Sequence, residues 1–324
     1  MRKETTQSME DKTIYGNTPC FLGAEHLVDH PEKTDEVDVI VYGVPWEGAV
    51  TWGDYTGCEL GPKVMRLSSG RYSGYLPELD HIDVLDHLKL GDMGDVSIVP
   101  ADVKQTMKNI KEFAGKVWDT GKFPVALGGD HGIAFPIISA LGEKTDGKVG
   151  IIHLDAHYDN HDSHHGDEFA RSTPFKRLYE DENVRTESLV HMGIHGPRNT
   201  AQNGRNAKEA GAQIMTLNEV REVGNLKEAA RKAYRMASEG TEAVYLTICS
   251  DVLDHAYNPG GPVDANGMTS NELLTIVHEV AKLGITGMEF VEVYPQQDAN
   301  DFSSHFATTL ILYALAGHIQ HSKK

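Results

Sequence analysis

From residue 37 to its end, the chain alternates short, almost wholly apolar runs with longer stretches whose apolar residues recur at helical spacing. Apolar runs without polar alternation are typical of strands buried on both faces, and helices between them are typical of parallel connections. We therefore predict an α/β fold with a mostly parallel sheet covered on both faces. The expected strands lie at 37–45, 88–96, 123–131, 148–159, 189–196, 212–217, 243–251 and 285–295. The clearest expected helices lie at 102–118, 226–238, 272–283 and 304–321.

The two ends of the chain differ in character. Residues 1–35 show no periodicity, and we expect them to form an N-terminal extension or arm that packs on something else. Residues 36–324 contain no internal repeat, no low-complexity linker and no break in composition. We therefore predict a single domain from residue 36 to residue 324.

The composition argues against several classes of partner. The chain has 48 acidic and 30 basic residues, and its formal charge is −18. Such a surface repels nucleic acid and anionic lipid and steers small cations toward the protein. No apolar run reaches the roughly 20 residues of a membrane-spanning helix, and the three cysteines are too few and too widely spaced for a disulfide framework. We expect a cytoplasmic protein with no nucleic-acid or membrane partner.

Polar side chains gather where three of the predicted strands end. Ligands of open α/β sheets bind beyond the carboxyl ends of the strands, so these side chains are candidates for one site. Carboxylates mixed with imidazoles suit Mn, Ni, Fe or Zn, and carboxylates in this number suit a two-metal centre. Taken singly, each group has a simpler explanation as a helix cap or a solvated turn. The residues are Asp130 and His131, then Asp155, His157 and Asp159, then Cys249 and Asp251.

Four short motifs resemble the ureohydrolase family, which includes arginase, agmatinase and guanidinobutyrase. They are GGDH (128–131), DAHYD (155–159), SDVLD (250–254) and VEVYP (291–295), in the family's order and spacing. GVPWEG (43–48), GPKVMR (61–66) and GDMGDV (91–96) add support, and His153 before DAHYD is similar to the agmatinase branch. The resemblance implies a three-layer α/β/α sandwich that assembles as trimers or hexamers. It also implies two Mn ions, or Ni in some relatives, that activate water to hydrolyse a guanidinium group into urea and an amine.

The resemblance assigns roles by position. His131, Asp155 and Asp159 would hold one metal ion, while His157, Asp155 and Asp251 would hold the other. Glu292 in VEVYP would accept hydrogen bonds from the guanidinium of a small cationic substrate, which a carboxylate does in a bidentate manner. Asp159 and Glu292 are the expected catalytic residues. The alternative for Glu292 is a structural role at the edge of the core.

One expected ligand is missing, because Cys249 stands where the family has an aspartate that bridges both metals. A thiolate can bind Zn or Ni and can bridge, but it is softer than a carboxylate and has no second oxygen. A buried cysteine also packs as a small hydrophobic residue. Cys249 is therefore either a ligand or an inert core residue. If it is a ligand, the chain is expected to hold two metal ions, and if it is inert, one or none.

Two further departures lie near the same site. Arg171 and Ser172 occupy positions where agmatinase-type relatives have His-Gly. Arginine does not exchange protons near neutral pH, and it would put a fixed positive charge where a cationic substrate approaches. Arg171 either lies in the substrate site or points outward in a surface ion pair. The loop at 258–269 is also about one residue shorter than the family pattern suggests.

Three functional hypotheses follow. In the first, the chain is a weakly active or non-catalytic subunit that supports an active paralogue in a heteromer acting on a substituted guanidine or biguanide. In the second, it is a self-sufficient agmatinase-like or guanidinobutyrase-like binuclear metallohydrolase, acting as a homo-oligomer with an unusual cysteine in its metal site. In the third, it binds a cationic amine without hydrolysis.

Overall fold

The computed structural model describes residues 19–49 and 55–323. At its centre lies a nine-stranded sheet in the order β1-β5-β2-β6-β11-β10-β7-β8-β9, and every pair of neighbouring strands is parallel. Two short strands, β3 (Tyr75–Leu76) and β4 (Ile82–Asp83), form a separate antiparallel ribbon. The strands of the main sheet are β1 (Glu25–His26), β2 (Val39–Val44), β5 (Leu90–Asp95), β6 (Phe123–Gly128), β7 (Val149–Leu154), β8 (Val184–Ile194), β9 (Gln213–Thr216), β10 (Ala243–Cys249) and β11 (Gly287–Val291).

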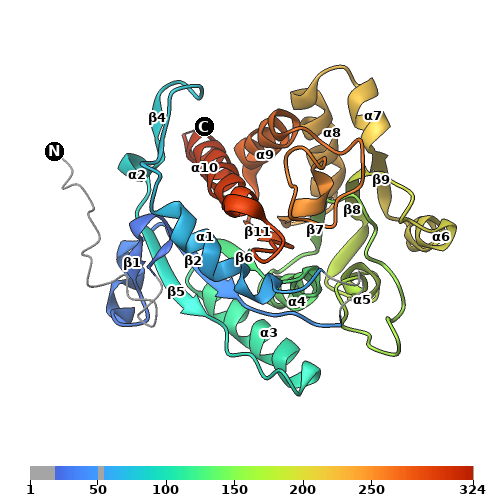
Figure 1. Ribbon diagram of the computed structural model, residues 1–324, viewed down its shortest axis with the longest axis horizontal. Helices are drawn as coiled ribbons and strands as arrows, with labels where there is room; N and C mark the ends of the chain where they lie inside the picture. Colours follow the sequence, from blue (N-terminus) through green and yellow to red (C-terminus); the bar gives the residue numbers. More distant parts are fainter. Residues whose placement is uncertain (1–18, 50–54, 324) are drawn as a thin grey trace.

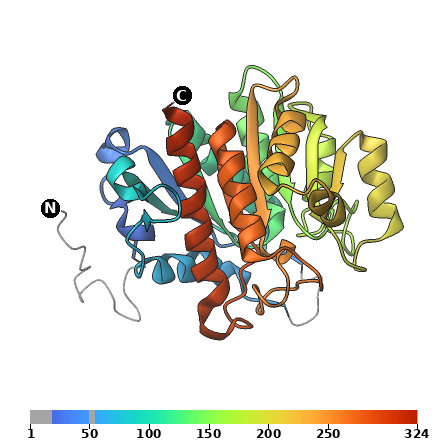
Figure 2. The same ribbon diagram turned by 90° about the horizontal axis from the view of Figure 1, so that it is seen from above.

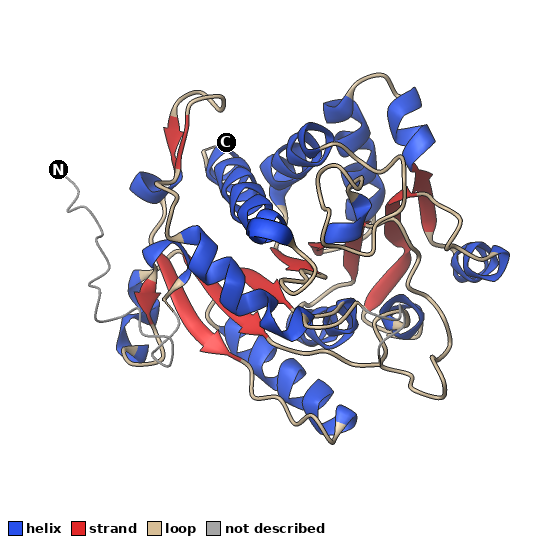
Figure 3. Ribbon diagram, in the orientation of Figure 1, coloured by secondary structure: helices blue, strands red, loops and turns tan. Residues whose placement is uncertain are grey.

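Helices cover both faces of this sheet and complete a three-layer α/β/α sandwich, so the predicted fold class is confirmed (Figures 1 and 3). One layer contains α1 (Gly61–Ser69), α7 (Leu217–Glu222), α8 (Leu226–Ser238), α9 (Ser270–Gly284) and α10 (Phe302–Ser322). The other contains α3 (Val103–Asp119), α4 (Ala134–Lys144) and α5 (Pro174–Tyr179). Two short helices, α2 (Val84–His87) and α6 (Ala201–Ala210), lie toward opposite ends of the sheet. Figure 2 shows α9 and α10 side by side, on the same face of the main sheet.

Strand β10 illustrates why the strands read as continuous apolar runs. Successive side chains of a strand point to opposite faces, so both sets are buried when helices cover both faces. Leu246 and Ile248 belong to the apolar cluster under α8, α9 and α10. Tyr245 and Cys249 belong to the cluster on the opposite face. The side chain of Cys249, the last residue of β10, therefore points to the face of the sheet that α3, α4 and α5 cover.

The helices begin where the sequence supplies caps. Asp102 accepts a hydrogen bond from the Gln105 amide at the start of α3, and Thr269 and Glu272 form a reciprocal capping box at the start of α9. Helix α10 is apolar on most of its circumference, since the consecutive residues Leu310, Ile311 and Leu312 are all buried. The sequence pattern suggests a single apolar face there, but contacts with α9 and α1 bury other sides of the helix as well.

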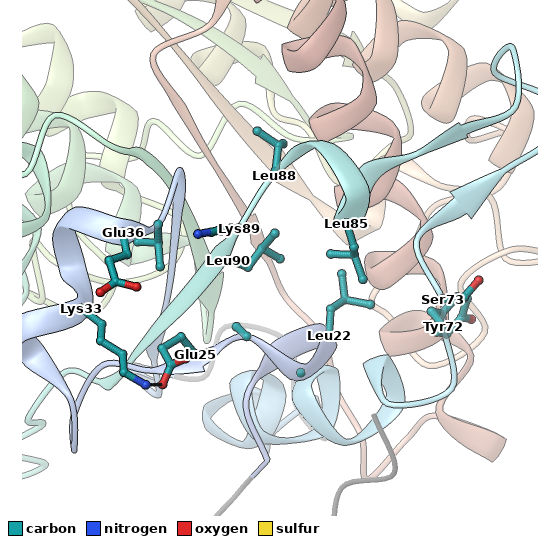
Figure 4. Close-up of a pocket in the computed structure, with 13 residues that line it drawn as sticks. Leu22, Glu25, Lys33, Glu36, Tyr72, Ser73, Leu85, Leu88, Lys89 and Leu90 are labelled. Atoms are coloured by element: carbon teal, nitrogen blue, oxygen red, sulfur yellow. Dashed lines mark hydrogen bonds and ion pairs between the residues drawn. The ribbon is translucent and has the colours of Figure 1, made fainter. Parts of the chain in front are cut away.

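The described part of the N-terminal extension joins the main domain. Strand β1 pairs with β5 and adds an edge to the sheet, while residues 1–18 lie outside the described residues. A pocket of about 520 Å³ lies between this segment and the chain around α2 and β5, and an ion pair between Lys33 and Glu25 lines it (Figure 4). None of the metal-ligand candidates lines this pocket. Among the described residues, no helix combines the length and apolarity needed to cross a membrane.

Candidate metal centre

The candidate residues follow four strands that are neighbours at the middle of the sheet, β6, β11, β10 and β7. His131 follows β6, Glu292 follows β11, Cys249 ends β10 and Asp155 follows β7. Because the four strands are parallel, their carboxyl ends lie at the same edge, and residues more than 100 positions apart in the sequence meet there.

Two groups of ligand atoms form at this edge, and Asp155 belongs to both. The first contains His131, Asp155 and Cys249, and the second contains Asp155, His157 and Asp251. In the first, Nδ1 of His131 lies 2.9 Å from Oδ2 of Asp155, and Asp159 adjoins this group with its Oδ2 3.0 Å from the same nitrogen. In the second, Nδ1 of His157 lies 2.8 Å from Oδ2 of Asp251 and 3.6 Å from Oδ1 of Asp155. Asp155 thus turns one oxygen toward each group, as a carboxylate shared between two cations would.

The electrostatics of the cluster also fit divalent cations. Burial, together with the charge of Asp251, raises the pKa of Asp155 to about 7. Burial and the charge of Asp155 raise the pKa of Asp159 to about 6. Burial also opposes ionisation of Asp251, yet the imidazole of His157 holds the pKa of that carboxyl well below its usual range. Packing three carboxyl groups into a buried site is costly, and cations bound between them would offset that cost.

Cys249 points into this cluster with a side chain that is 1% exposed. Its Sγ lies within 4.8 Å of ligand atoms of His131 and Asp155. Burial, with the charges of Asp155 and Asp251, raises the pKa of the thiol well above its usual value. The thiol in turn helps to lower the pKa of Asp251 in the second group. The side chain therefore belongs to the first group and acts electrostatically on the second, at the position where the resemblance expects a bridging ligand.

A hydrogen-bonded chain that the sequence reading missed supports His131. Its Nε2 lies 2.9 Å from Oγ1 of Thr247, whose hydroxyl donates to Oε1 of the fully buried Glu289 at 2.6 Å. Thr247 and Glu289 are register partners of β10 and β11. Partners of this kind fix the ring orientation of a metal-ligating histidine. The available signal was an acidic residue inside the otherwise apolar strand GMEFV.

Two more supporting contacts join residues that are distant in the sequence. Nε2 of His153 lies 2.8 Å from Oδ2 of Asp155, and Nδ1 of His153 lies 2.7 Å from Nδ1 of His191 on β8. Nε2 of His157 lies 3.1 Å from Oδ2 of Asp264, which comes from the shortened loop at 258–269. The sequence offered no specific signal for His191 or Asp264.

Glu292 lies beside the first group of ligands. Its Oε1 accepts the backbone N–H of His131 at 2.7 Å, and its Oε2 accepts the hydroxyl of Tyr294. Glu292 and Asp159 both have left-handed backbones, with φ of 65° and 43°. Such conformations are uncommon for residues other than glycine and are often found at functional sites.

Arg171 points into the site, so the alternative of an outward surface ion pair is wrong. Its side chain is 3% exposed, and its Nη2 donates to Oε1 of Glu47 at 3.0 Å. Its Nη1 lies 3.5 Å from Oε2 of Glu292 and donates to the hydroxyl of Tyr294. The loop before α5 carries this arginine to the ends of the central strands.

The buried carboxyl groups predict how the stability of the metal-free protein depends on pH. Burial is the largest cause of a raised pKa in four of them, about 6 for Asp159 and about 7 for Asp130, Asp155 and Glu289. Between the unfolded pKa near 4 and these folded values, the folded state binds more protons than the unfolded state. The contribution of these four groups to stability therefore falls as pH rises from 5 to 7, by on the order of 1 kcal/mol per pH unit for each group at most. Histidines whose pKa burial lowers, His153 and His191 among them, contribute in the opposite direction below about pH 6.5.

Urea unfolding in the presence of EDTA at pH 5, 6 and 7 measures this dependence. The variant Glu289→Gln is the control, because it removes one titrating group and should make the fall shallower. The same pH dependence in the wild type and in Glu289→Gln would contradict the prediction.

Comparison with known proteins agrees with this geometry. The Arginase family matches residues 37–317. Agmatinase of Bacillus subtilis is 33% identical over 93% of this chain and 98% of its own length. Guanidinopropionase of Pseudomonas aeruginosa is 30% identical over 92% of each chain. Formiminoglutamase of Trypanosoma cruzi, solved with Mn²⁺, has the same fold, with a TM-score of 0.82 at 22% identity, covering 94% of this chain and 99% of that one.

The family profile and the two relatives cover the motifs from GVPWEG to VEVYP, and the nine-stranded sheet brings those motifs to one edge. The predicted resemblance is therefore confirmed. The chain belongs to the arginase family, and its reaction class is hydrolysis of a guanidino or amidino C–N bond.

Proposed function

We propose that this chain is a subunit of a ureohydrolase that releases urea and an amine from a substituted guanidine or biguanide. Alone it is weakly active or non-catalytic, and it supports an active paralogue within a heteromeric trimer or hexamer. The observation that carries this proposal is the buried thiol of Cys249 among the candidate metal ligands, beside His131 and Asp155. Three cysteines without disulfides suit a cytoplasmic location.

The remaining donors still suit two divalent cations, Mn²⁺ or Ni²⁺. His131, Asp155 and Asp159 would hold one, and His157, Asp155 and Asp251 the other. The cations would supply the Lewis acidity that activates water for attack on the guanidinium carbon. With a thiol at this position instead of a carboxylate, the site would offer fewer hard oxygens, and Mn²⁺ prefers oxygen donors. Weaker loading and slower hydrolysis follow.

The chain's own residues would divide the other tasks. Glu292, fixed by the His131 amide, would accept two N–H groups of the substrate and orient its carbon toward the ligand groups. Asp159 would carry a proton to the departing amine on Oδ1, since its Oδ2 faces His131 in the ligand group. Both roles rest on the family resemblance and on the positions of these side chains at the strand ends.

One observation favours the alternative of a self-sufficient binuclear hydrolase. Sγ of Cys249 lies within 4.8 Å of ligand atoms of His131 and Asp155. A thiolate in this position can ligate Ni²⁺ or Zn²⁺. The chain would then work alone with a nickel-selective site, and Cys249→Asp would lower its activity or change its metal preference.

The proposal predicts that the isolated chain holds one metal ion or fewer after incubation with Mn²⁺ and, separately, with Ni²⁺. Elemental analysis per chain measures the content, and urea release is assayed with agmatine, 3-guanidinopropionate and a biguanide. Adding an arginase-family paralogue that has aspartate at the Cys249 position should restore hydrolysis. Two ions per chain together with full activity alone would establish the self-sufficient enzyme and overturn the heteromer.

A further inference from the structure

We propose that Arg171 is a built-in occupant of the guanidinium subsite, so that the chain's own guanidinium fills the place where the substrate's would bind. This inference rests on the proposed role of Glu292 as the substrate's carboxylate partner. It deepens the proposed function, because it gives a second physical reason, independent of the metals, for weak activity of the chain alone.

The contacts of Arg171 are those that a bound guanidinium ligand would make. One terminal nitrogen donates to Oε1 of Glu47 at 3.0 Å, and the other lies 3.5 Å from Oε2 of Glu292. The second nitrogen also donates to the hydroxyl of Tyr294, and the central guanidinium carbon lies 5.7 Å from the centroid of the Tyr294 ring. Two carboxylates and an aromatic face form a recognition site for a planar cation.

Glu292 connects this occupied site to the metal centre. The same carboxylate that faces Arg171 through Oε2 accepts the backbone N–H of His131 through Oε1 at 2.7 Å. An ion pair with a purely structural role has no need of a carboxylate fixed beside a candidate metal ligand. A substrate guanidinium bound to Glu292 would have to share the oxygen that Arg171 already faces.

Burial and charge make this occupancy stable. Arg171 and Glu292 are both 3% exposed, so water does not screen their attraction strongly. Burial alone would lower the pKa of the guanidinium, but the charges of Glu292 and the fully buried Asp130 hold that pKa above its ordinary value. An incoming cation must therefore displace a tethered cation that is always present, which lowers its apparent affinity.

The test uses the guanidinium ion itself as the probe, titrated calorimetrically as its chloride into the metal-free full-length protein. Replacing Arg171 with alanine should open the site, and we expect Arg171→Ala to bind guanidinium at least tenfold more tightly than the wild type. Low millimolar guanidinium should also raise the melting temperature of this variant, whereas equal concentrations of sodium chloride, ammonium chloride or urea should not. The double variant R171A/E292Q should lose both effects.

A surface control separates the site from nonspecific binding. Arg235 is 63% exposed and pairs with Glu228 on α8, so Arg235→Ala should bind guanidinium no better than the wild type. If Arg171→Ala does not fold, Arg171→Gln keeps a long polar side chain but removes the tethered charge, and it should bind guanidinium measurably. Equal guanidinium affinity in the wild type and the folded variant, or binding that survives E292Q, overturns the inference.

The outcome is separable from that of the proposed function. If the chain proves fully active alone and R171A still gains guanidinium, then the heteromer proposal fails while Arg171 remains a displaceable occupant. If the chain is inactive alone and R171A gains nothing, then the occupancy fails and the proposed function stands.

Discussion

Replacing Cys249 with aspartate raises the manganese content of the isolated chain from one ion or fewer to two. The reason is geometric, because Sγ lies within 4.8 Å of ligand atoms of His131 and of Asp155, and Asp155 is shared with the second group. A carboxylate at this position offers two hard oxygens, one toward each group of ligands. Mn²⁺ prefers such donors over a thiol.

The same substitution makes the metal-free protein less stable and the metal-loaded protein more stable. Without cations, the introduced carboxylate would be a further buried charge beside Asp155 and Asp251, which repel it. With cations, binding to the folded state alone stabilises the protein by roughly 4 kcal/mol at a concentration a thousand times Kd. We therefore expect a much larger manganese-induced rise in melting temperature for the variant than for the wild type.

Elemental analysis and thermal melts with EDTA or Mn²⁺ check this prediction. Cys249→Asn is the matched control, because asparagine has the size of aspartate without its charge and should gain no second ion. If the wild type already holds two ions and the aspartate variant holds no more, Cys249 is itself an effective ligand, and the prediction is wrong.

Replacing Gly129 with alanine unfolds the site and much of the fold around it. A Cβ at this position would lie 1.9 Å from the backbone oxygen of Trp46 and 2.8 Å from its backbone nitrogen and carbon. These are backbone atoms, and the Trp46 oxygen also accepts the Asp130 N–H at 2.9 Å. Moving them aside would therefore cost free energy. In addition, the Gly129 carbonyl accepts the Glu292 N–H at 2.9 Å. We expect a loss of about 4 kcal/mol or more and no metal binding.

Gly115, half-buried on α3 beside the end of α4, provides a matched control. The nearest atom to a Cβ there is the flexible end of Lys144, at 3.8 Å. Gly115→Ala should therefore be neutral or stabilise the protein by up to about 1 kcal/mol, because alanine favours a helix interior. Chemical denaturation compares the two variants, and a loss below about 1 kcal/mol for Gly129→Ala would contradict the clash.

The sequence predicted the sheet well because strand character is a local property. The run 243–251 became β10, Ala243–Cys249, and 285–295 became β11, Gly287–Val291. Burial on both faces leaves a continuous apolar signal in each strand, whichever strands pair with it. The order of the strands within the sheet is not a local property. Strands β6, β11, β10 and β7 are consecutive neighbours in the sheet although they do not follow one another in the chain.

The strand-end residues were predictable for a related reason. Parallel strands present their carboxyl ends at one edge, so polar residues after separate apolar runs indicate a shared site without any knowledge of strand order. His131, Asp155 and Asp251 were found in this way, and they meet as expected. Their roles as metal ligands stay predictions.

Contacts that depend on strand register, on loop paths or on side-chain direction were decided only by the tertiary structure. Thr247 meets Glu289 because β10 and β11 pair in one register. Asp264 meets His157 because its loop folds back over the strand ends. Arg171 was compatible with either the surface or the site, and the carboxylates of the half-buried Glu47 and the buried Glu292 draw it inward. Local patterns thus determined the sheet and the edge that carries the site, whereas non-local packing decided which groups meet there.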